Sequence, residues 1–242
     1  MIKVERLHFK LDEKLNKLAS NTHQWISPEQ KDFALNEAQI KLVKQKVGKN
    51  NNYGMGFDSF RKRYQDLEFL VVPHEELDAT KTKEPISIYS AELNSLKKKF
   101  FLPVDIYTIA ERGRCKDRIV VVEQVVKHSD VPTLLSATDS NPSFEYQATF
   151  AVISSGQLRV YTEQSPESFK INKCHVSYLR YPVNICMGEY EDFDGSIQPK
   201  VDCEFPESLE DELIEIAVED LALSTENSAA AEAAKIRKKD SE

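Results

Sequence analysis

The sequence predicts an α+β protein, with helical segments from both termini packed together and an antiparallel β domain inserted between them. Apolar residues recur at a spacing close to 3.6 near both ends of the chain and at a spacing of two in the middle, which are the periods of helices and strands. Hydrophobic residues make up 40% of the 242 residues, the ordinary content of a folded domain with a core. We expect a helical part over residues 1–83 and a sandwich-like or barrel-like β domain over 84–190. Residues 191–242 then supply an acidic linker, a helix and an alanine-rich tail that complete the helical part.

The first 70 residues contain signals for three helices. Leucines at helical spacing predict a helix or a partly extended arm around residues 10–20. Aromatic and leucine residues at the same spacing predict a third amphipathic helix from Phe57 towards Leu70. The stretch Asn50–Gly56 lies before it and is rich in Asn and Gly, which tolerate the positive φ of turns.

The second helix has the clearest start signal in the chain. Ser27 can cap it, Pro28 fits the first turn, and Gln30 can reach back to the cap. We expect Trp25 to pack as a staple against this helix, and the helix to end at Gly48. Its apolar sides are predicted to carry Phe33, Ile40, Val43 and Val47, with Leu35 and Leu42 on a neighbouring face.

The middle of the chain is predicted to form strands, with a β-branched central one at 118–126. The turn residues Ser155–Gln157 predict a hairpin, and Pro182 ends the last strand because proline has no N–H to donate. No helical segment in this part is long enough for a crossover, so we expect antiparallel pairing. The expected strands are 86–88, 104–109, 118–126, 144–154, 158–161 and Cys174–Tyr181.

The last helix is predicted from Leu209 to about Thr225. Pro206 fixes its entry, Ser208 can cap it with Asp211 three residues on, and acidic side chains fill its first turns. The alanine-rich tail that follows could continue the helix or fray. The apolar stripe of this helix contains Leu209, Leu213, Ile214, Ile216, Ala217 and Leu221. If both ends of the chain share one core, the residues that should pack together are Phe33, Ile40, Val43, Leu209, Leu213 and Ile216.

Composition excludes several classes of protein. The net charge of −8, with only short basic clusters, argues against a dedicated nucleic-acid binder. Such a charge suits a protein that lines a channel through which DNA slides without sticking. No run of about 18 apolar residues predicts a membrane span, and the charged N-terminus does not resemble a signal peptide.

No metal or cofactor site is predicted. The four cysteines, Cys115, Cys174, Cys186 and Cys203, lack the paired spacing of a zinc site, so we expect buried or half-buried thiols. Cys174 and His175 are neighbours in a strand and should point to opposite faces. The acidic loop Glu189–Ser196 is the best candidate for a cation site, with Asp192, Asp194 and Gly195. A solvated loop is favoured, because the glycine and the final ligand are misplaced for an EF-hand.

No catalytic residues are predicted. The chain has no nucleophile elbow, zinc-protease helix, phosphate-binding loop or dinucleotide fingerprint. The five histidines, at positions 8, 23, 74, 128 and 175, lie in unrelated contexts. A hydrolase built on the acidic loop is a weaker alternative.

Two blocks of the chain resemble the ring-forming neck and tail proteins of crAss-like tailed bacteriophages. One runs from Tyr178-Leu179-Arg180-Tyr181-Pro182 through the acidic loop to Phe205-Pro206-Glu207-Ser208 and the helix after it. The other is the helix start from Ser27 to Gln39, and the two blocks cover roughly a third of the chain in matching order. Neither block is a catalytic signature.

The resemblance implies a non-enzymatic virion structural protein, made in the host cytoplasm, that forms a ring between portal and tail. It implies a twelve-fold homo-oligomer that contacts the portal protein or adjacent ring and tail proteins, and a channel for genomic DNA that passes without sequence-specific contact. The alternative from another class is a cytoplasmic adaptor or an assembly-chaperone-like module that binds proteins. We expect assembly contacts in loops and terminal segments, namely Asn50–Gly56, Pro132–Pro142, Glu189–Ile197 and Ser228–Glu242.

Overall fold

The chain forms helices and strands in two compact units, which confirms the α+β class. The computed structural model describes residues 1–18, 25–47, 65–82, 87–137, 140–163, 168–188, 190, 197 and 199–224. Met1–Phe69 and Pro182–Glu242 make up one unit, which we call the helical unit. Leu70–Tyr181 make up the other, which we call the β unit.

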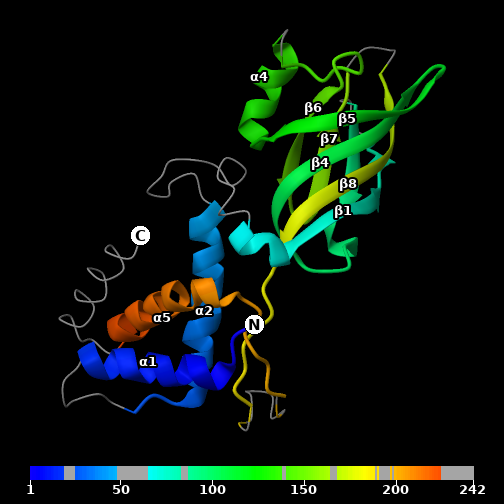
Figure 1. The fold of residues 1–242 in the computed structure, drawn as a ribbon. Coiled ribbons are helices and arrows are strands. Elements are labelled where there is room, and N and C mark those ends of the chain that lie inside the picture. The colour runs from blue at the N-terminus through cyan, green and yellow to red at the C-terminus, as the bar shows by residue number, and fades with distance from the viewer. Residues whose placement is uncertain are drawn as a thin grey trace. The chain divides into compact units, whose positions relative to one another are not determined.

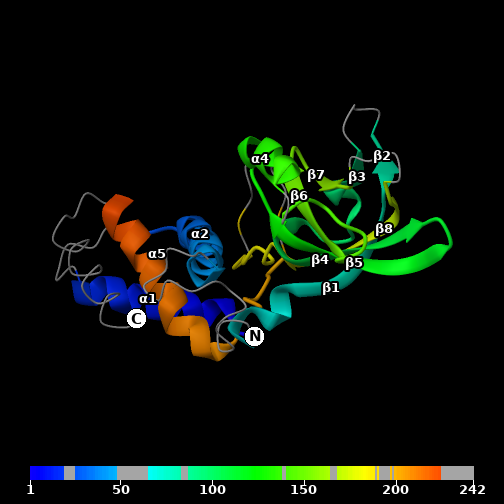
Figure 2. The same cartoon turned by 90° about the horizontal axis from the view of Figure 1, so that it is seen from above.

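The helical unit joins the two ends of the chain (Figures 1 and 2). In its described residues, the main helices are α1 (Val4–Leu18), α2 (Pro28–Val47) and α5 (Glu210–Ser224), and α5 packs against both of the others. A short β-bridge adds main-chain pairing, because Ile2 and Cys203 exchange N–H to O hydrogen bonds of 2.8 and 3.0 Å. The prediction that terminal segments pack together is therefore confirmed.

A seam of ion pairs links the two ends. Basic residues outnumber acidic ones in residues 1–69, whereas acidic residues greatly outnumber basic ones in 182–242. Opposite charges on the two segments therefore meet when the helices pack, and pairs this close attract each other although solvent screens them. The pairs across the seam are Arg6–Glu210 (2.7 Å), Lys10–Glu210 (2.9 Å), Lys14–Glu215 (3.1 Å), Lys41–Asp220 (2.7 Å) and Lys46–Glu212 (2.6 Å).

The buried side of α2 differs from the predicted one. Phe33 is 66% exposed and Ile40 only half-buried, so the expected six-residue core is wrong for these two residues. Trp25 is 79% exposed and is not a staple; its neighbour Ile26 is buried instead. The residues of α2 that are buried are Asp32, Ala34, Leu35, Ala38, Gln39, Leu42 and Val43. The predicted stripe of α5 is fully buried and is confirmed.

Only one of the two predicted helix caps is present. The Ser27 hydroxyl accepts a hydrogen bond from the Gln30 N–H (3.3 Å), and the Gln30 side chain accepts one from the Ser27 N–H (3.2 Å). This is the predicted capping box. Ser208 is exposed inside a 3-10 turn, Glu207–Leu209, which precedes α5. Its prediction as a cap is wrong, because that extra turn moves the start of α5 to Glu210.

The β unit is one curled sheet of eight strands in the order β1-β8-β4-β5-β6-β7-β3-β2 (Figures 1 and 2). The shape agrees with the expected barrel-like domain. The strands are β1 (Val71–Asp78), β2 (Thr80–Lys81), β3 (Ile88–Glu92), β4 (Phe100–Arg112), β5 (Cys115–Val125), β6 (Ala148–Ser154), β7 (Gln157–Tyr161) and β8 (Lys170–Arg180). Two further 3-10 turns lie at Leu93–Ser95 and His128–Asp130.

Two features of this sheet contradict the sequence analysis. β5 and β6 pair in parallel, although all other pairings are antiparallel as expected. The connection between them contains the short helix α4 (Val131–Ser136), which supplies a crossover that was not predicted. In addition, β1 and β2 lie within residues 1–83, the part expected to be helical; among the described residues 65–82, helical turns occupy 65–70 just before β1. The rest of the predicted third helix, and Asn50–Gly56, lie outside the described residues.

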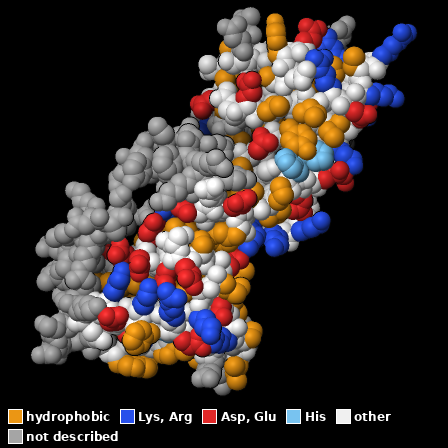
Figure 3. Space-filling model, in the orientation of Figure 1, with side chains coloured by type: hydrophobic (Ala, Val, Ile, Leu, Met, Phe, Trp, Pro, Cys, Tyr) orange, Lys and Arg blue, Asp and Glu red, His pale blue; other side chains and the backbone are white. Residues whose placement is uncertain are grey.

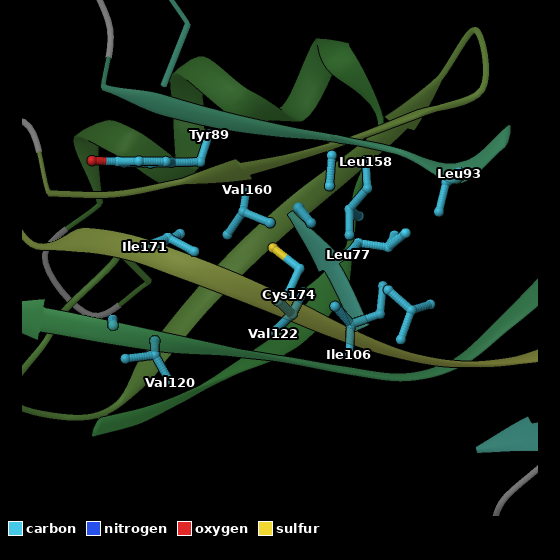
Figure 4. Packing of buried hydrophobic residues seen from close by; sticks show 14 of the residues in the cluster. Leu77, Tyr89, Leu93, Ile106, Val120, Val122, Leu158, Val160, Ile171 and Cys174 are labelled. Carbon is cyan, nitrogen blue, oxygen red and sulfur yellow. The ribbon is translucent and has the colours of Figure 1, made fainter. Parts of the chain in front are cut away.

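The inner face of the curled sheet forms the core of the β unit. Side chains from distant strands, among them Ile106, Val120, Val160, Ile171 and Cys174, point into one interior (Figure 4). The predicted hairpin is confirmed: β6 and β7 meet at Ser155 and Gly156, both with positive φ (51° and 74°). That pair of conformations is typical of the two-residue turn whose twist matches its strands.

Candidate assembly surfaces

The outer face of the sheet is covered over only part of its width. On β3, β6 and β7, the outward side chains Ile88, Phe150, Val152 and Tyr161 form an apolar cluster with Val131, Leu134 and Leu135 of α4. Within the described residues of the β unit, no helix covers the outer face of β4, β5 and β8 in the same way. The fold therefore leaves one part of the outer face open.

The open part carries apolar and aromatic side chains, which we call the outer patch. Ile119 is 52% exposed and Val121 is 42% exposed, although both lie in a central strand. The register places Val121 beside Tyr107, and Tyr107 beside His175 on the next strand. Figure 3 shows orange side chains beside pale-blue histidines on this unit. The outer patch consists of Tyr107 and Ile109 from β4, Ile119 and Val121 from β5, and His175 from β8.

Ring contacts hold Tyr107 in place at the centre of the outer patch. Its ring stacks on His175, with centroids 4.8 Å apart and planes 13° from parallel. The ring of His74 is a second neighbour, with its centroid 5.6 Å from that of Tyr107. Because rings in contact lose little further freedom when a partner covers them, such a surface can bind at a small entropic cost.

His74 reaches Tyr107 through an irregularity in β1. The strand bulges between Val72 and Glu75, and His74 has φ 46°, which is unusual for a residue other than glycine. The Ser177 hydroxyl stabilises this conformation: it accepts a hydrogen bond from the His74 N–H (3.1 Å) and lies 3.3 Å from its Nδ1. The bulge thus aims the imidazole at the outer patch.

Two lysines beside the outer patch are paired with carboxylates. Lys173 forms an ion pair with Glu76 (2.5 Å) and Lys170 forms one with Glu111 (3.0 Å). Hydrogen bonds from these lysines hold the pKa of both carboxyl groups below the usual value. The surface therefore presents apolar area between neutralised pairs, which suits contact with a protein better than contact with phosphate.

A second arrangement, in the helical unit, anchors the segment that leads to the acidic loop. Asp32 of α2 is buried and lies 2.8 Å from His8 Nε2 of α1. Its other oxygen accepts hydrogen bonds from the Met187 N–H (2.8 Å) and the Tyr190 hydroxyl (2.7 Å). Burial, together with the bonds to Cys186 and Asp32, raises the pKa of Tyr190 far above its usual value. We call these four residues, His8, Asp32, Met187 and Tyr190, the Asp32 anchor.

Further along α2, the side chain of Asn36 pairs with the main chain of Ile185 as a neighbouring strand would. Asn36 donates to the Ile185 carbonyl (3.0 Å) and accepts from the Ile185 N–H (2.7 Å). Gln39 also reaches the Val183 carbonyl (3.4 Å). Because this segment belongs to no sheet, these bonds satisfy main-chain groups that would otherwise lack partners. One side of α2 is therefore polar yet buried.

The structure describes only part of the predicted contact segments. Asp192, Asp194 and Gly195 lie outside the described residues, so the cation alternative for the acidic loop stays a prediction. Ser228–Glu242 also lies outside them. At the ends of the acidic segment, Tyr190 is bound to Asp32 and Ile197 is 71% exposed. Within Pro132–Pro142, α4 packs on the sheet of its own unit.

The four cysteines differ in burial, and none of them belongs to a described metal site. Cys115 is exposed, whereas Cys174, Cys186 and Cys203 are buried, and all four are free thiols. Cys174 faces the core while its neighbour His175 stacks on Tyr107, which confirms their opposite directions. Among the described residues, no group of three or more His, Cys, Asp or Glu is placed to hold a metal ion.

Sequence reasoning missed both the outer patch and the Asp32 anchor. The histidines seemed unrelated, yet His74 and His175 contact the same tyrosine. One signal was present in β5, where the four residues Ile119–Val122 are all apolar. A strand with one face in water alternates polar and apolar residues, whereas an unbroken run indicates that both faces become buried. Asp32 and Tyr190 carry no such signal, because they are 158 positions apart.

No helix in the described part of the chain is both long and apolar enough to cross a membrane.

Comparison with known protein families gives a match over nearly the whole chain: the model of the family described as "Phage tail ring protein 3/4" matches residues 3–234. This match confirms the resemblance to ring proteins of crAss-like phages. No curated protein matches the chain.

Proposed function

Because the chain belongs to the phage tail ring protein 3/4 family, we propose that it is a non-enzymatic structural protein that forms a homo-oligomeric ring between portal and tail. The observation that carries this proposal is the extent of the match, residues 3–234, which spans both the helical unit and the β unit. A match to one unit alone would have allowed a shared module in a different protein.

In this proposal the ring is twelve-fold and its centre is a channel for genomic DNA. The distribution of charge in the chain supports the proposal of such a channel. The β unit has as many basic as acidic residues, so the net charge of −8 lies on the helical unit. DNA binds tightly where lysines and arginines replace its counterions, and a neutral or acidic wall offers no such exchange. The DNA would pass without being held.

The partners that follow are the portal protein or the adjacent ring and tail proteins, and the subunit would be made in the host cytoplasm and built into the virion. A ring in a stack meets its own copies sideways and unlike proteins above and below. The chain offers separate surfaces for these roles in its two units, the outer patch and the segment that the Asp32 anchor holds.

The test is the protein content and structure of purified virions. We expect mass spectrometry to detect the chain in intact particles, and electron cryomicroscopy to show twelve copies in a ring around the channel below the portal. A cytoplasmic adaptor or assembly chaperone would be present in infected cells but missing from particles. Absence of the chain from intact particles would therefore reject the proposal in favour of that alternative.

A further inference from the structure

We propose that the outer patch is the surface through which each subunit contacts the next copy of this chain in the ring. The inference rests on the proposed ring and adds to it the position of the contact and the identity of the partner. The occupant to which we commit is a second copy of the chain. DNA, the portal protein and unlike ring proteins are the other occupants that the test can reveal.

The first argument is the contrast within one sheet. Where the outer face lies over β3, β6 and β7, α4 covers Phe150 and Val152, and both side chains are almost fully buried. Where it lies over β4 and β5, Ile119 and Val121 remain about half exposed. Contiguous exposed apolar area between polar groups is typical of protein–protein contact sites. Among the described residues, the patch therefore lacks the cover that α4 gives to the face over β3, β6 and β7.

The second argument concerns which molecule provides the cover. The β unit carries equal numbers of acidic and basic residues, so copies of it can lie side by side without net repulsion. The helical unit carries the net charge of −8, and two copies of it repel each other more strongly. Contact between like subunits is consequently least costly through the β unit.

The third argument is against DNA as the occupant. Binding along a DNA backbone needs free cationic side chains. The lysines beside the patch, Lys170 and Lys173, are held by Glu111 and Glu76. These pairs also spare a protein partner the cost of covering an unpaired charge.

The fourth argument is that the surface is built on regular elements. Tyr107, Ile109, Ile119 and Val121 lie on adjacent paired strands, and the rings of His74 and His175 both contact the tyrosine ring. Surfaces on strands are held more precisely than surfaces on loops. A ring interface repeats identically around the axis, so it benefits from such precision.

A footprint on purified virions tests the proposal. Hydroxyl radicals oxidise tyrosine and histidine side chains that solvent reaches. We expect oxidation of Tyr107 to fall at least about tenfold between the isolated subunit and the virion, because a ring contact of standard size excludes water from its centre. Tyr146, which is 87% exposed, is the reference for full reactivity in the isolated subunit. Equal oxidation of Tyr107 in both states would overturn the proposal.

A pair of matched variants tests the role of the patch in assembly. Val121→Asp places a charge in the patch, and Val125→Asp places the same charge on the same strand at a residue of similar exposure, 42% against 43%. A phage that lacks the gene is supplied with each variant, and its incorporation into particles is measured against the parent chain. We expect Val121→Asp to reduce incorporation at least about tenfold and Val125→Asp to leave it nearly unchanged.

Circular dichroism and thermal melting of the purified variants show whether both are folded. If Val121→Asp is unfolded, Ile119→Ser replaces it, since a small polar group at an exposed strand position is tolerated by the fold. Normal incorporation of a folded patch variant, or an equal loss with Val125→Asp, would overturn the proposal.

Cross-linking identifies the occupant. Val121 is replaced by a photoactivatable phenylalanine analogue, and virions that contain this chain are irradiated. A product made of two copies of the chain supports the proposal, whereas a product with another virion protein or with DNA rejects it. The proposed function is rejected by a different result, namely that the parent chain is missing from purified virions, so the two failures can be told apart.

Discussion

Cys115 differs from the other three cysteines in its exposure to solvent, which predicts a different reactivity towards thiol reagents. It is exposed, whereas burial raises the pKa of Cys174 to about 12 and that of Cys203 to about 11, and Cys186 is also buried. Thiolate is the reacting species, so the thiols of Cys174 and Cys203 are both inaccessible and protonated, and that of Cys186 is inaccessible. We expect a thiol reagent at pH 8 to modify one cysteine rapidly in the folded protein and all four after unfolding in urea. Cys115→Ser should abolish the rapid phase, and rapid modification of a second cysteine would contradict the described burial.

Asp32 is the residue whose loss should most destabilise the helical unit. Asp32→Ala leaves the His8 ring, the Met187 N–H and the Tyr190 hydroxyl buried without their shared acceptor. Removing one partner of a buried charged network costs about 3 kcal/mol of unfolding free energy. Urea titration measures this loss. Glu29→Ala, at an exposed position of the same helix, should change the stability by less than about 0.5 kcal/mol.

The Asp32 anchor also explains why the buried side of α2 could not be read from the sequence. Hydrophobicity favours Phe33 over Asp32 for an interior position, yet the structure buries Asp32 and exposes Phe33. Asp32 is buried in place of Phe33 because its hydrogen-bond partners lie near residue 187, far away in the chain. Where side-chain partners are local, as with Ser27 and Gln30, the prediction is confirmed.

At the scale of elements, the two predicted caps allow a matched experiment. Ser27 bonds the Gln30 N–H at the start of α2, whereas Ser208 lies exposed inside a 3-10 turn. Ser27→Ala should lower the free energy of unfolding by about 1 kcal/mol, the typical effect of losing a cap. Ser208→Ala should change it much less, and chemical denaturation of both variants compares them. Equal losses would mean that Ser208 caps α5 after all.

The strands show which element-level features a sequence reveals. The hairpin β6–β7 was predictable because its turn residues, Ser155 and Gly156, are adjacent and chemically distinctive. The parallel pairing of β5 with β6 was not, because it depends on a crossover through α4, a helix of only six residues. The open outer face of β5 could not be predicted for another reason. An unbroken apolar run is typical of a strand that is covered on both faces. Only the fold shows that, among the described residues, no layer covers the outer face of β5.

At the scale of the whole molecule, the order of hydrophobic periods was enough to predict the α+β class and the meeting of the two ends. The excess of basic residues near the start and of acidic residues near the end already indicates that these segments attract each other, and the pairs between α5 and the first two helices bear this out. The strand β1 was not predicted: it begins just after the expected end of the third helix towards Leu70, within the part expected to be helical, residues 1–83. Long-range pairing with β8, rather than local preference, makes it a strand.

The way the chain enters and leaves the β unit predicts that this unit folds by itself. Val71 of β1 pairs with Leu179 of β8, so the two ends of residues 70–181 are neighbours in the sheet. Cutting the chain before residue 70 and after residue 181 breaks no strand pairing, and the apolar core of the sheet consists of residues from this unit alone. A fragment of residues 70–181 should therefore show the circular dichroism of a β protein and one cooperative unfolding transition in urea.

The helical unit should behave differently, because α5 packs on α1 and α2 across the two separate stretches of sequence. Residues 1–69 alone should not fold stably, whereas 1–69 joined to 182–242 by a short glycine-serine linker should, since only neighbouring chain ends need to be bridged. The linked protein is the control that separates loss of α5 from general intolerance of truncation. A fragment 70–181 that unfolds without a cooperative transition would show instead that the sheet depends on the helical unit, and that the two units fold as one.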